Sequence, residues 1–273
     1  MSDSIAAYSE HAQLSMAAYA AFTERMSGQE YKVRLKDIGF SDAQAGAFIN
    51  TYSVVKVFND PLTSFSATLF QKGGTAEKIL AIRGTESFQD IVISDLQIGL
   101  FGLTNQYESL RNFLPQILSQ ITPGGTLTVA GHSLGGFLAQ VFALDNQNLV
   151  SHAYTTNTPG LGGGLVNPLG SFGIAGEIVS NSAITNLIAQ GHSFVASQGR
   201  QFGTATSVFI EQSANPFDNH GKMSITDSLA LYSVFAAVDP MLNASEITNV
   251  LAASSQINER RLESSLDALR RAF

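Results

Sequence analysis

One short segment constrains the fold of this chain more than any other. The pentapeptide Gly131-His132-Ser133-Leu134-Gly135 lies between apolar stretches at 126–130 and 136–144. The first stretch is typical of a buried strand, and the second is typical of a helix. A strand that passes directly into a helix turns sharply, and glycines on both sides remove Cβ atoms that would clash. The segment therefore predicts a strand, a tight turn and a helix, with the Ser133 hydroxyl projecting from the turn.

The composition narrows the classes of protein to which the chain can belong. Its 273 residues are 44% hydrophobic and 14% charged, which supplies enough apolar material for a substantial core. We expect residues 1–273 to form a single domain, or the catalytic part of a longer protein. The net charge of −7 disfavours a nucleic acid as partner, because phosphate binding needs a basic patch. The absence of cysteine excludes disulfides, zinc–thiolate sites and a thiol nucleophile.

The sequence carries few signs of targeting. No lysine or arginine precedes Arg25, so the basic region of an N-terminal secretory signal is missing. The longest strongly apolar run, at 228–238, is much shorter than the ~20 residues that a membrane-spanning helix needs. We therefore expect a chain that is secreted without an N-terminal signal peptide, or is otherwise cytoplasmic.

Strand-like and helix-like segments alternate along the chain, which predicts an α/β fold with a mostly parallel sheet flanked by helices. The expected strands are 52–57, 65–70, 78–83, 126–130, 152–156, 184–189 and 206–211. The expected helices are 3–26, 105–120, 136–144, 228–238 and a C-terminal helix with an apolar stripe of Leu262, Leu266, Leu269 and Phe273. A glycine-rich loop at 159–171 is expected to form a lid, a pocket edge or a plain surface excursion.

A serine on such a turn serves as a nucleophile when nearby amides stabilise the negative charge of the reaction intermediate. The amide of Leu134 lies at the start of the expected helix and is the first candidate donor. The second is Thr85, which follows Arg83-Gly84 at the end of an earlier strand. Thr85 is also a good residue for capping a helix, and both roles are compatible. We expect Asp95 to brace this loop.

These segments together resemble the class 3 lipase family. The matching pieces are Ile82-Arg83-Gly84-Thr85 with Asp90 and Asp95, the Gly131–Gly136 turn, and the stretch 156–162 after the next strand. The stretch 220–235 is similar to bacterial extracellular lipases of that broad type. The resemblance covers residues 50–240 and implies an α/β-hydrolase fold, hydrolysis of carboxylic esters and a mobile lid at 86–93. We expect neither a cofactor nor a catalytic metal.

A serine nucleophile needs a base to accept its proton. In this fold the histidine of the catalytic triad lies on a loop after the last strand, and His220 occupies that place. We therefore predict His220 as the general base. We expect His11 in the N-terminal helix, His152 at the start of a strand, and His132 turned away from the nucleophile.

The acid of the triad departs from the family pattern. The resemblance implies an aspartate directly after the strand 184–189, but residues 178–210 contain neither aspartate nor glutamate. His192 stands in the expected place. A weakened triad, or a serine–histidine dyad with His192 as a neighbour, is therefore open.

Three carboxylates remain close to the base in sequence. Asp227 falls in the first turn of the helix after His220, where it could also simply favour the helix N-terminus. Glu211 ends the last strand, so the acid could have moved one strand along. Asp218 is two residues from His220 and is equally typical of a turn. We favour Asp227 as the acid, with Glu211 as the alternative.

The expected activity is hydrolysis of a lipid ester through an acyl-enzyme on Ser133, as in a triacylglycerol lipase or esterase. Apolar segments at 91–103 and 159–176 offer a pocket for an acyl chain, which implies transient contact with a lipid interface. One alternative is a phospholipase A that acts on membrane lipids. The other is a binding module with a hydrolase fold whose catalytic residues have decayed.

Overall fold

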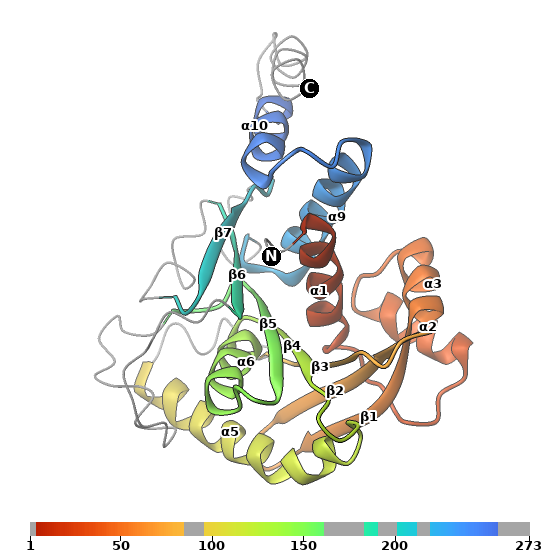
Figure 1. Cartoon of the computed structure of the whole chain (residues 1–273), viewed down its shortest axis with the longest axis vertical. Helices are drawn as coiled ribbons and strands as arrows, with labels where there is room; N and C mark the ends of the chain where they lie inside the picture. Colours follow the sequence, from red (N-terminus) through yellow and green to blue (C-terminus); the bar gives the residue numbers. More distant parts are fainter. Residues whose placement is uncertain (1–3, 85–95, 161–182, 191–200, 212–218, 256–273) are drawn as a thin grey trace.

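The computed structural model describes residues 4–84, 96–160, 183–190, 201–211 and 219–255 (Figure 1). Within these ranges the strands form one seven-stranded sheet in sequence order. The strands are β1 (Tyr52–Asp60), β2 (Phe65–Lys72), β3 (Lys78–Ile82), β4 (Leu127–His132), β5 (Val150–Thr156), β6 (Ile184–Ala189) and β7 (Thr204–Val208). The pairs β1–β2 and β2–β3 are antiparallel, and every pair from β3 to β7 is parallel. The predicted mostly parallel sheet is confirmed.

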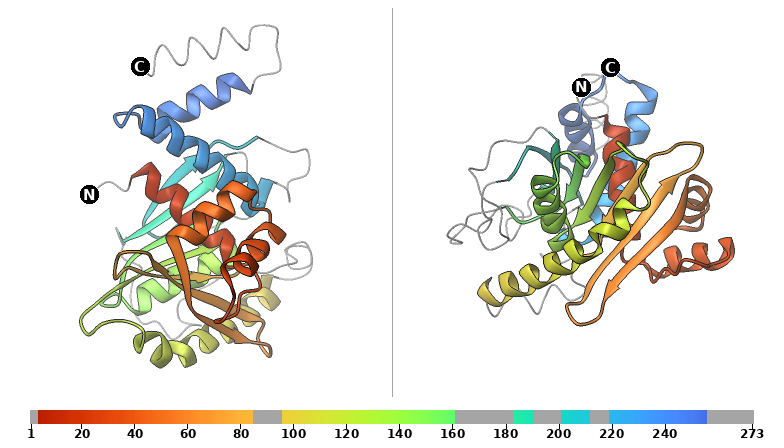
Figure 2. Two further views of the ribbon diagram at one scale, coloured as in Figure 1. Left: turned by 90° about the vertical axis from the view of Figure 1, so that its right-hand side faces the viewer. Right: turned by 60° about the horizontal axis from the view of Figure 1, so that its bottom comes forward.

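Helices cover both faces of the sheet (Figures 1 and 2). Their bounds are α1 (Ile5–Ala17), α2 (Gly28–Asp37), α3 (Asp42–Thr51), α5 (Leu96–Leu118), α6 (Leu134–Asp145), α9 (Lys222–Val238) and α10 (Ala244–Ser254). Helices α5 and α6 pack on one face, and α1 packs on the other face against α9. Leu80 and Ile82 point towards the first pair of helices, while Ile79 and Ala81 point towards the second face. This alternation along β3 is the expected consequence of burial on both sides.

The helices differ from the predictions in four places. Helix α5 begins at Leu96, nine residues before the predicted start at 105. The predicted helix 3–26 ends at Ala17, and the chain then folds into α2 and α3, which the sequence analysis did not predict. Helix α9 begins at Lys222, six residues before the predicted start at 228. Helix α10 was not predicted either, while the predicted C-terminal helix with Leu262 lies outside the described residues.

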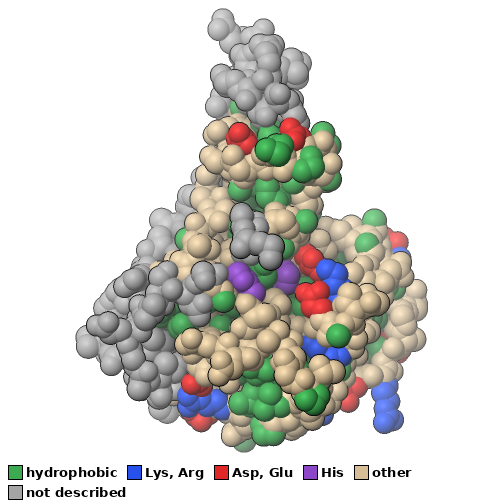
Figure 3. All heavy atoms as spheres, viewed as in Figure 1, with side chains coloured by type: hydrophobic (Ala, Val, Ile, Leu, Met, Phe, Trp, Pro, Cys, Tyr) green, Lys and Arg blue, Asp and Glu red, His purple; other side chains and the backbone are tan. Residues whose placement is uncertain are grey.

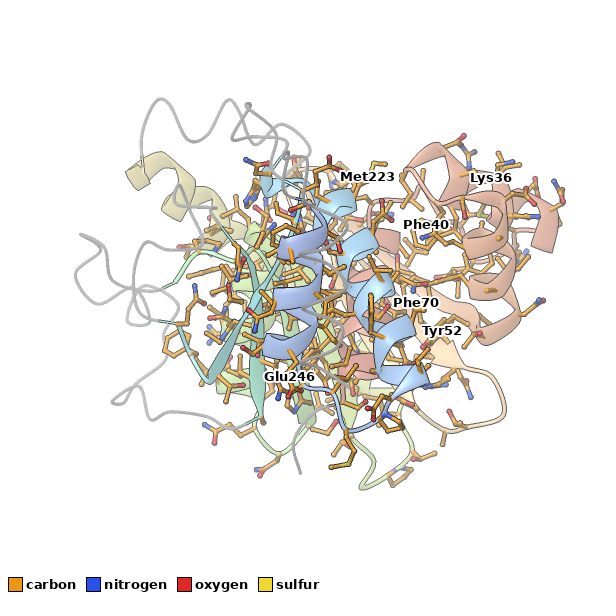
Figure 4. The ribbon with its side chains drawn as sticks, turned by 90° about the horizontal axis from the view of Figure 1, so that it is seen from above. Lys36, Phe40, Tyr52, Phe70, Met223 and Glu246 are labelled. Carbon is orange, nitrogen blue, oxygen red and sulfur yellow. The ribbon has the colours of Figure 1, made fainter. Side chains whose placement is uncertain are left out.

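Helices α2 and α3 begin with side-chain caps that set their bounds. The hydroxyls of Ser27 and Ser41 each accept a hydrogen bond from the backbone amide three residues later. In turn, the side chains of Glu30 and Gln44 accept hydrogen bonds from the backbone amides of Ser27 and Ser41. Such capping boxes satisfy backbone amides that the first turn leaves unpaired. The two helices lie beside β1, and Figure 4 shows Phe40, Tyr52 and Phe70 on this side of the molecule. All three rings are buried in the same core cluster.

Helix α9 exposes an apolar stripe. Leu231, Val234 and Val238 are partly or largely exposed along it, and Met241 in the following turn is 87% exposed. Figure 3 shows hydrophobic side chains in this region, with acidic side chains beside them. None of the helices that the structure describes combines the length and apolar character needed to cross a membrane.

Tyr31 of α2 offers a test of the core. Its ring packs edge-on against Phe22, and its hydroxyl is buried with no hydrogen-bond partner among the described residues. Burial raises the pKa of this hydroxyl. We expect Tyr31→Phe to raise the free energy of unfolding by about 1 kcal/mol, because it removes an unpaired polar group from the core. Urea unfolding followed by circular dichroism measures the change.

Tyr52→Phe is the matched control. The Tyr52 hydroxyl donates a hydrogen bond to Glu10, whose carboxylate also pairs with Lys72. Its removal leaves the partly buried Glu10 carboxylate with one hydrogen-bond partner fewer, so we expect this variant to lose stability. Equal losses of stability in both variants would contradict the assignment of the Tyr31 hydroxyl as unpaired.

Candidate active site

Ser133 lies on the sharp turn that the sequence predicts. It follows the last residue of β4 and precedes the first residue of α6, with φ 56° and ψ −128°. Few residues other than glycine adopt a positive φ, so the turn holds Ser133 in a strained conformation. A Cβ atom on Gly131 would overlap main-chain atoms of Gly135. The flanking glycines are therefore required by the close approach of strand and helix.

His220 lies directly beside the nucleophile. Its Nε2 atom is 2.8 Å from Ser133 Oγ, and both side chains are at least 95% buried. The hydroxyl donates and the imidazole nitrogen accepts, which is the arrangement that a general base requires. The two residues are 87 positions apart in sequence, and the structure brings them together as the sequence analysis expects.

The start of α6 supplies one donor for an oxyanion. Leu134 is the first residue of α6, so no carbonyl of an earlier helical turn pairs with its amide. The aligned peptide dipoles make the same end of the helix favourable for negative charge. An amide here can therefore stabilise the oxyanion that forms when Ser133 attacks a carbonyl group.

The end of β3 packs tightly against this turn. A Cβ atom on Gly84 would lie 2.6 Å from the carbonyl oxygen of His132 and 3.3 Å from the amide nitrogen of Gly135. Glycine is required here because a side chain would push the two segments apart. The next residue, Thr85, lies outside the described residues, as do Asp95 and the expected lid 86–93.

The described part of the structure does not pair the favoured carboxylates with the base. Helix α9 begins earlier than predicted, so Asp227 lies in its second turn, where its side chain is exposed. Neither Asp227 nor Glu211 forms a hydrogen bond with His220 in this structure. Asp218 and His192 lie outside the described residues. The identity of the acid stays a prediction.

Three residues near His220 escaped the sequence analysis in whole or in part. His132 does not contact the Ser133 hydroxyl; its ring packs against His220, with 5.1 Å between ring centroids. Asn157 follows β5 and hydrogen bonds to the main chain of His220. Tyr19, which follows α1, hydrogen bonds to His132. No sequence motif marks Tyr19, and Asn157 falls within the matching stretch 156–162 without a predicted role.

Two further histidines in the described residues pack against Tyr154. His11 lies in α1 and His152 in β5, as predicted. The His11 ring stacks on Tyr154, and the His152 ring packs against the same tyrosine at a tilt of 32°. Burial lowers the pKa of His11, whose Nδ1 atom donates to the carbonyl of Ala7. Across the described residues, no group of three or more histidine, aspartate or glutamate side chains is arranged to hold a metal ion.

A family model and several solved structures are similar to the chain. The model of a phospholipase-like family, described as the Tle-like phospholipase domain, matches residues 10–215. The match includes Ser133 and ends before His220. No curated protein matches the sequence significantly.

The similar structures share the architecture. Lip2 lipase from Yarrowia lipolytica is 21% identical, with a TM-score of 0.52, over 76% of this chain and 78% of that chain. A propeptide complex of Rhizomucor miehei lipase is 17% identical, with a TM-score of 0.50, over 78% of this chain and 68% of that chain. At these identities the likeness establishes the fold, which is of the α/β-hydrolase type.

Proposed function

Because the chain belongs to the Tle-like phospholipase domain family, we propose that it hydrolyses carboxylic ester bonds of phospholipids with Ser133 as nucleophile. The observation that carries this proposal is the 2.8 Å hydrogen bond between Ser133 Oγ and His220 Nε2 at the strained turn. A decayed binding module would have no need to keep a strained serine paired with a buried histidine. The family favours a phospholipid over a glyceride as substrate.

The reaction proceeds through an acyl-enzyme. Ser133 Oγ attacks the acyl carbonyl carbon while its proton passes to His220 Nε2. The amides of Leu134 and Thr85 stabilise the resulting oxyanion. The ester C–O bond then breaks, and His220 returns the proton to the leaving oxygen of the lysophospholipid. A water molecule, deprotonated by His220, attacks the acyl-enzyme, which releases the fatty acid and restores Ser133.

The packing of Gly84 supports the role of Thr85. The main chain of Gly84 lies against the turn that carries Ser133, and Thr85 directly follows Gly84 in the sequence. A donor on this loop and a donor at the start of α6 would approach the oxyanion from two sides. This is the arrangement that the strand–turn–helix motif uses in other hydrolases.

The substrate is tested by offering two lipids to the full chain. Vesicles of zwitterionic phosphatidylcholine avoid repulsion by the net charge of −7, and emulsified triolein supplies a glyceride. We expect one fatty acid for each lysophosphatidylcholine, at a rate well above the release from triolein. Hydrolysis of triolein alone would overturn the phospholipid assignment. No hydrolysis of either lipid, with no labelling of Ser133 by a fluorophosphonate, would overturn the serine hydrolase itself.

A further inference from the structure

The main-chain carbonyl of His220 accepts hydrogen bonds from two buried side chains. The oxygen lies 2.8 Å from His132 Nε2 and 3.2 Å from Asn157 Nδ2. His132 is the last residue of β4 and Asn157 follows β5, so the donors come from neighbouring parallel strands. Ser133 follows the same β4. The pairing of β4 with β5 therefore fixes the position of Ser133 relative to both side chains that donate to His220.

Asn157 is bound on three sides. Its backbone amide donates to the carbonyl of Leu187, and its Oδ1 atom accepts from the amide of Ala189, each at 2.9 Å. Its φ of 47° lies in the left-handed region, which glycine adopts without strain and asparagine adopts at some cost. The side chain thus links the ends of β5 and β6 to His220, and this link offsets the cost of the backbone conformation.

The hydrogen bonds also define the proton positions of His132. A carbonyl oxygen can only accept, so Nε2 of His132 carries a proton and donates to His220. In the neutral ring Nδ1 is then an acceptor, and the Tyr19 hydroxyl donates to it over 3.1 Å. Tyr19 is held in place by the ammonium group of Lys222, which lies 4.4 Å from the centre of its ring.

We propose that Asn157 and His132 are positioning residues that clamp the main chain of His220, and that Tyr19 fixes the tautomer of His132. The clamp keeps Nε2 of His220 within reach of Ser133 Oγ while the proton moves to the base and back. Small displacements of a base are costly, because proton transfer depends steeply on distance and direction. The inference rests on the proposed roles of Ser133 and His220.

The first test replaces Asn157 with glycine. Asn157→Gly keeps the left-handed backbone but removes the donor to His220. On the soluble ester p-nitrophenyl butyrate we expect kcat to fall about 10- to 100-fold while KM changes less than about twofold. The rate of Ser133 labelling by a fluorophosphonate should fall in the same proportion. Asn186→Ala is the matched control, because Asn186 is buried and hydrogen bonded in the same sheet without contact to His220.

The second test uses a pair of substitutions at His132. The side-chain nitrogen of glutamine can occupy the place of Nε2, whereas that of asparagine can reach only the place of Nδ1. We expect His132→Gln to keep kcat within about fivefold of the unsubstituted chain, and His132→Asn to lose as much as Asn157→Gly. A merely structural role of the ring would lower both variants alike. If thermal melts show that Asn157→Gly does not fold, the comparison of the two His132 variants still tests whether the side chain must donate to His220.

The outcomes separate this inference from the function on which it rests. Hydrolysis and labelling by the unsubstituted chain, with full kcat in Asn157→Gly or equal kcat in the two His132 variants, would overturn the clamp alone. An unsubstituted chain that neither hydrolyses the ester nor is labelled at Ser133 would overturn the proposed function, and the clamp with it.

Discussion

Replacing Ser133 with alanine is expected to lower kcat for phosphatidylcholine by about 10⁵- to 10⁶-fold. The hydroxyl forms the covalent bond to the acyl group, and no other hydroxyl is hydrogen bonded to His220 Nε2 among the described residues. Losses of this size accompany removal of a serine nucleophile, and binding together with the oxyanion donors supplies the residual rate. Fatty-acid release from vesicles, measured over hours against a blank without protein, resolves such a residual rate.

The controls for this variant follow from the geometry. His220→Ala is expected to cost nearly as much, and the double variant no more than either alone, because nucleophile and base act as one unit. Ser119→Ala alters an exposed serine after α5 and should leave the rate unchanged. Retention of more than about 1% of the activity by Ser133→Ala would mean that another group attacks the ester.

The sheet could be predicted because its signals are local. Residues 184–189 form β6 with the bounds that the sequence predicts, and the turn at Ser133 lies between β4 and α6 as expected. Strands that are buried on both faces carry continuous apolar runs, which stand out from the surrounding turns. The fold class therefore follows from the order along the chain of predicted strands that are only five or six residues long.

Helices α2 and α3 could not be predicted from periodicity. Helix α2 buries only Tyr31 and Leu35 of its own residues, so it has almost no apolar stripe. The one signal that could have found it is the capping pair of Ser27 and Glu30, which needs only a spacing of three. When helices are predicted mainly from the spacing of apolar residues, a helix whose start is set by a capping side chain and whose apolar face is small is missed.

The catalytic residues that belong to a short sequence motif could be predicted from the sequence. Ser133 and Leu134 belong to one pentapeptide, and the position of His220 after the last strand follows from chain order. Tyr19 and Asn157 lie 113 residues from His132 and 63 residues from His220, respectively. Only the packing of α1 and β5 around β4 brings them to the base, so no local pattern could reveal their roles.

Replacing Gly135 with alanine is expected to lower the free energy of unfolding by about 3–5 kcal/mol. The new Cβ atom would overlap the carbonyl oxygen of Ile82 and lie 2.7 Å from main-chain atoms of Arg83 and Gly84. Backbone atoms of a buried strand cannot move aside as a flexible side chain can. Because Ile82 pairs with Gly131 across β3 and β4, the clash would strain the sheet beside the nucleophile. Urea unfolding measures the loss.

Gly28→Ala is the control for this substitution. Gly28 begins α2, and a Cβ atom there would meet nothing within 4 Å, so we expect equal or slightly higher stability. A folded but inactive Gly135→Ala variant would mean that Gly84 had shifted to relieve the clash, carrying the Thr85 amide away from the oxyanion. A variant that is both stable and fully active would contradict the close packing of β3 against the Ser133 turn.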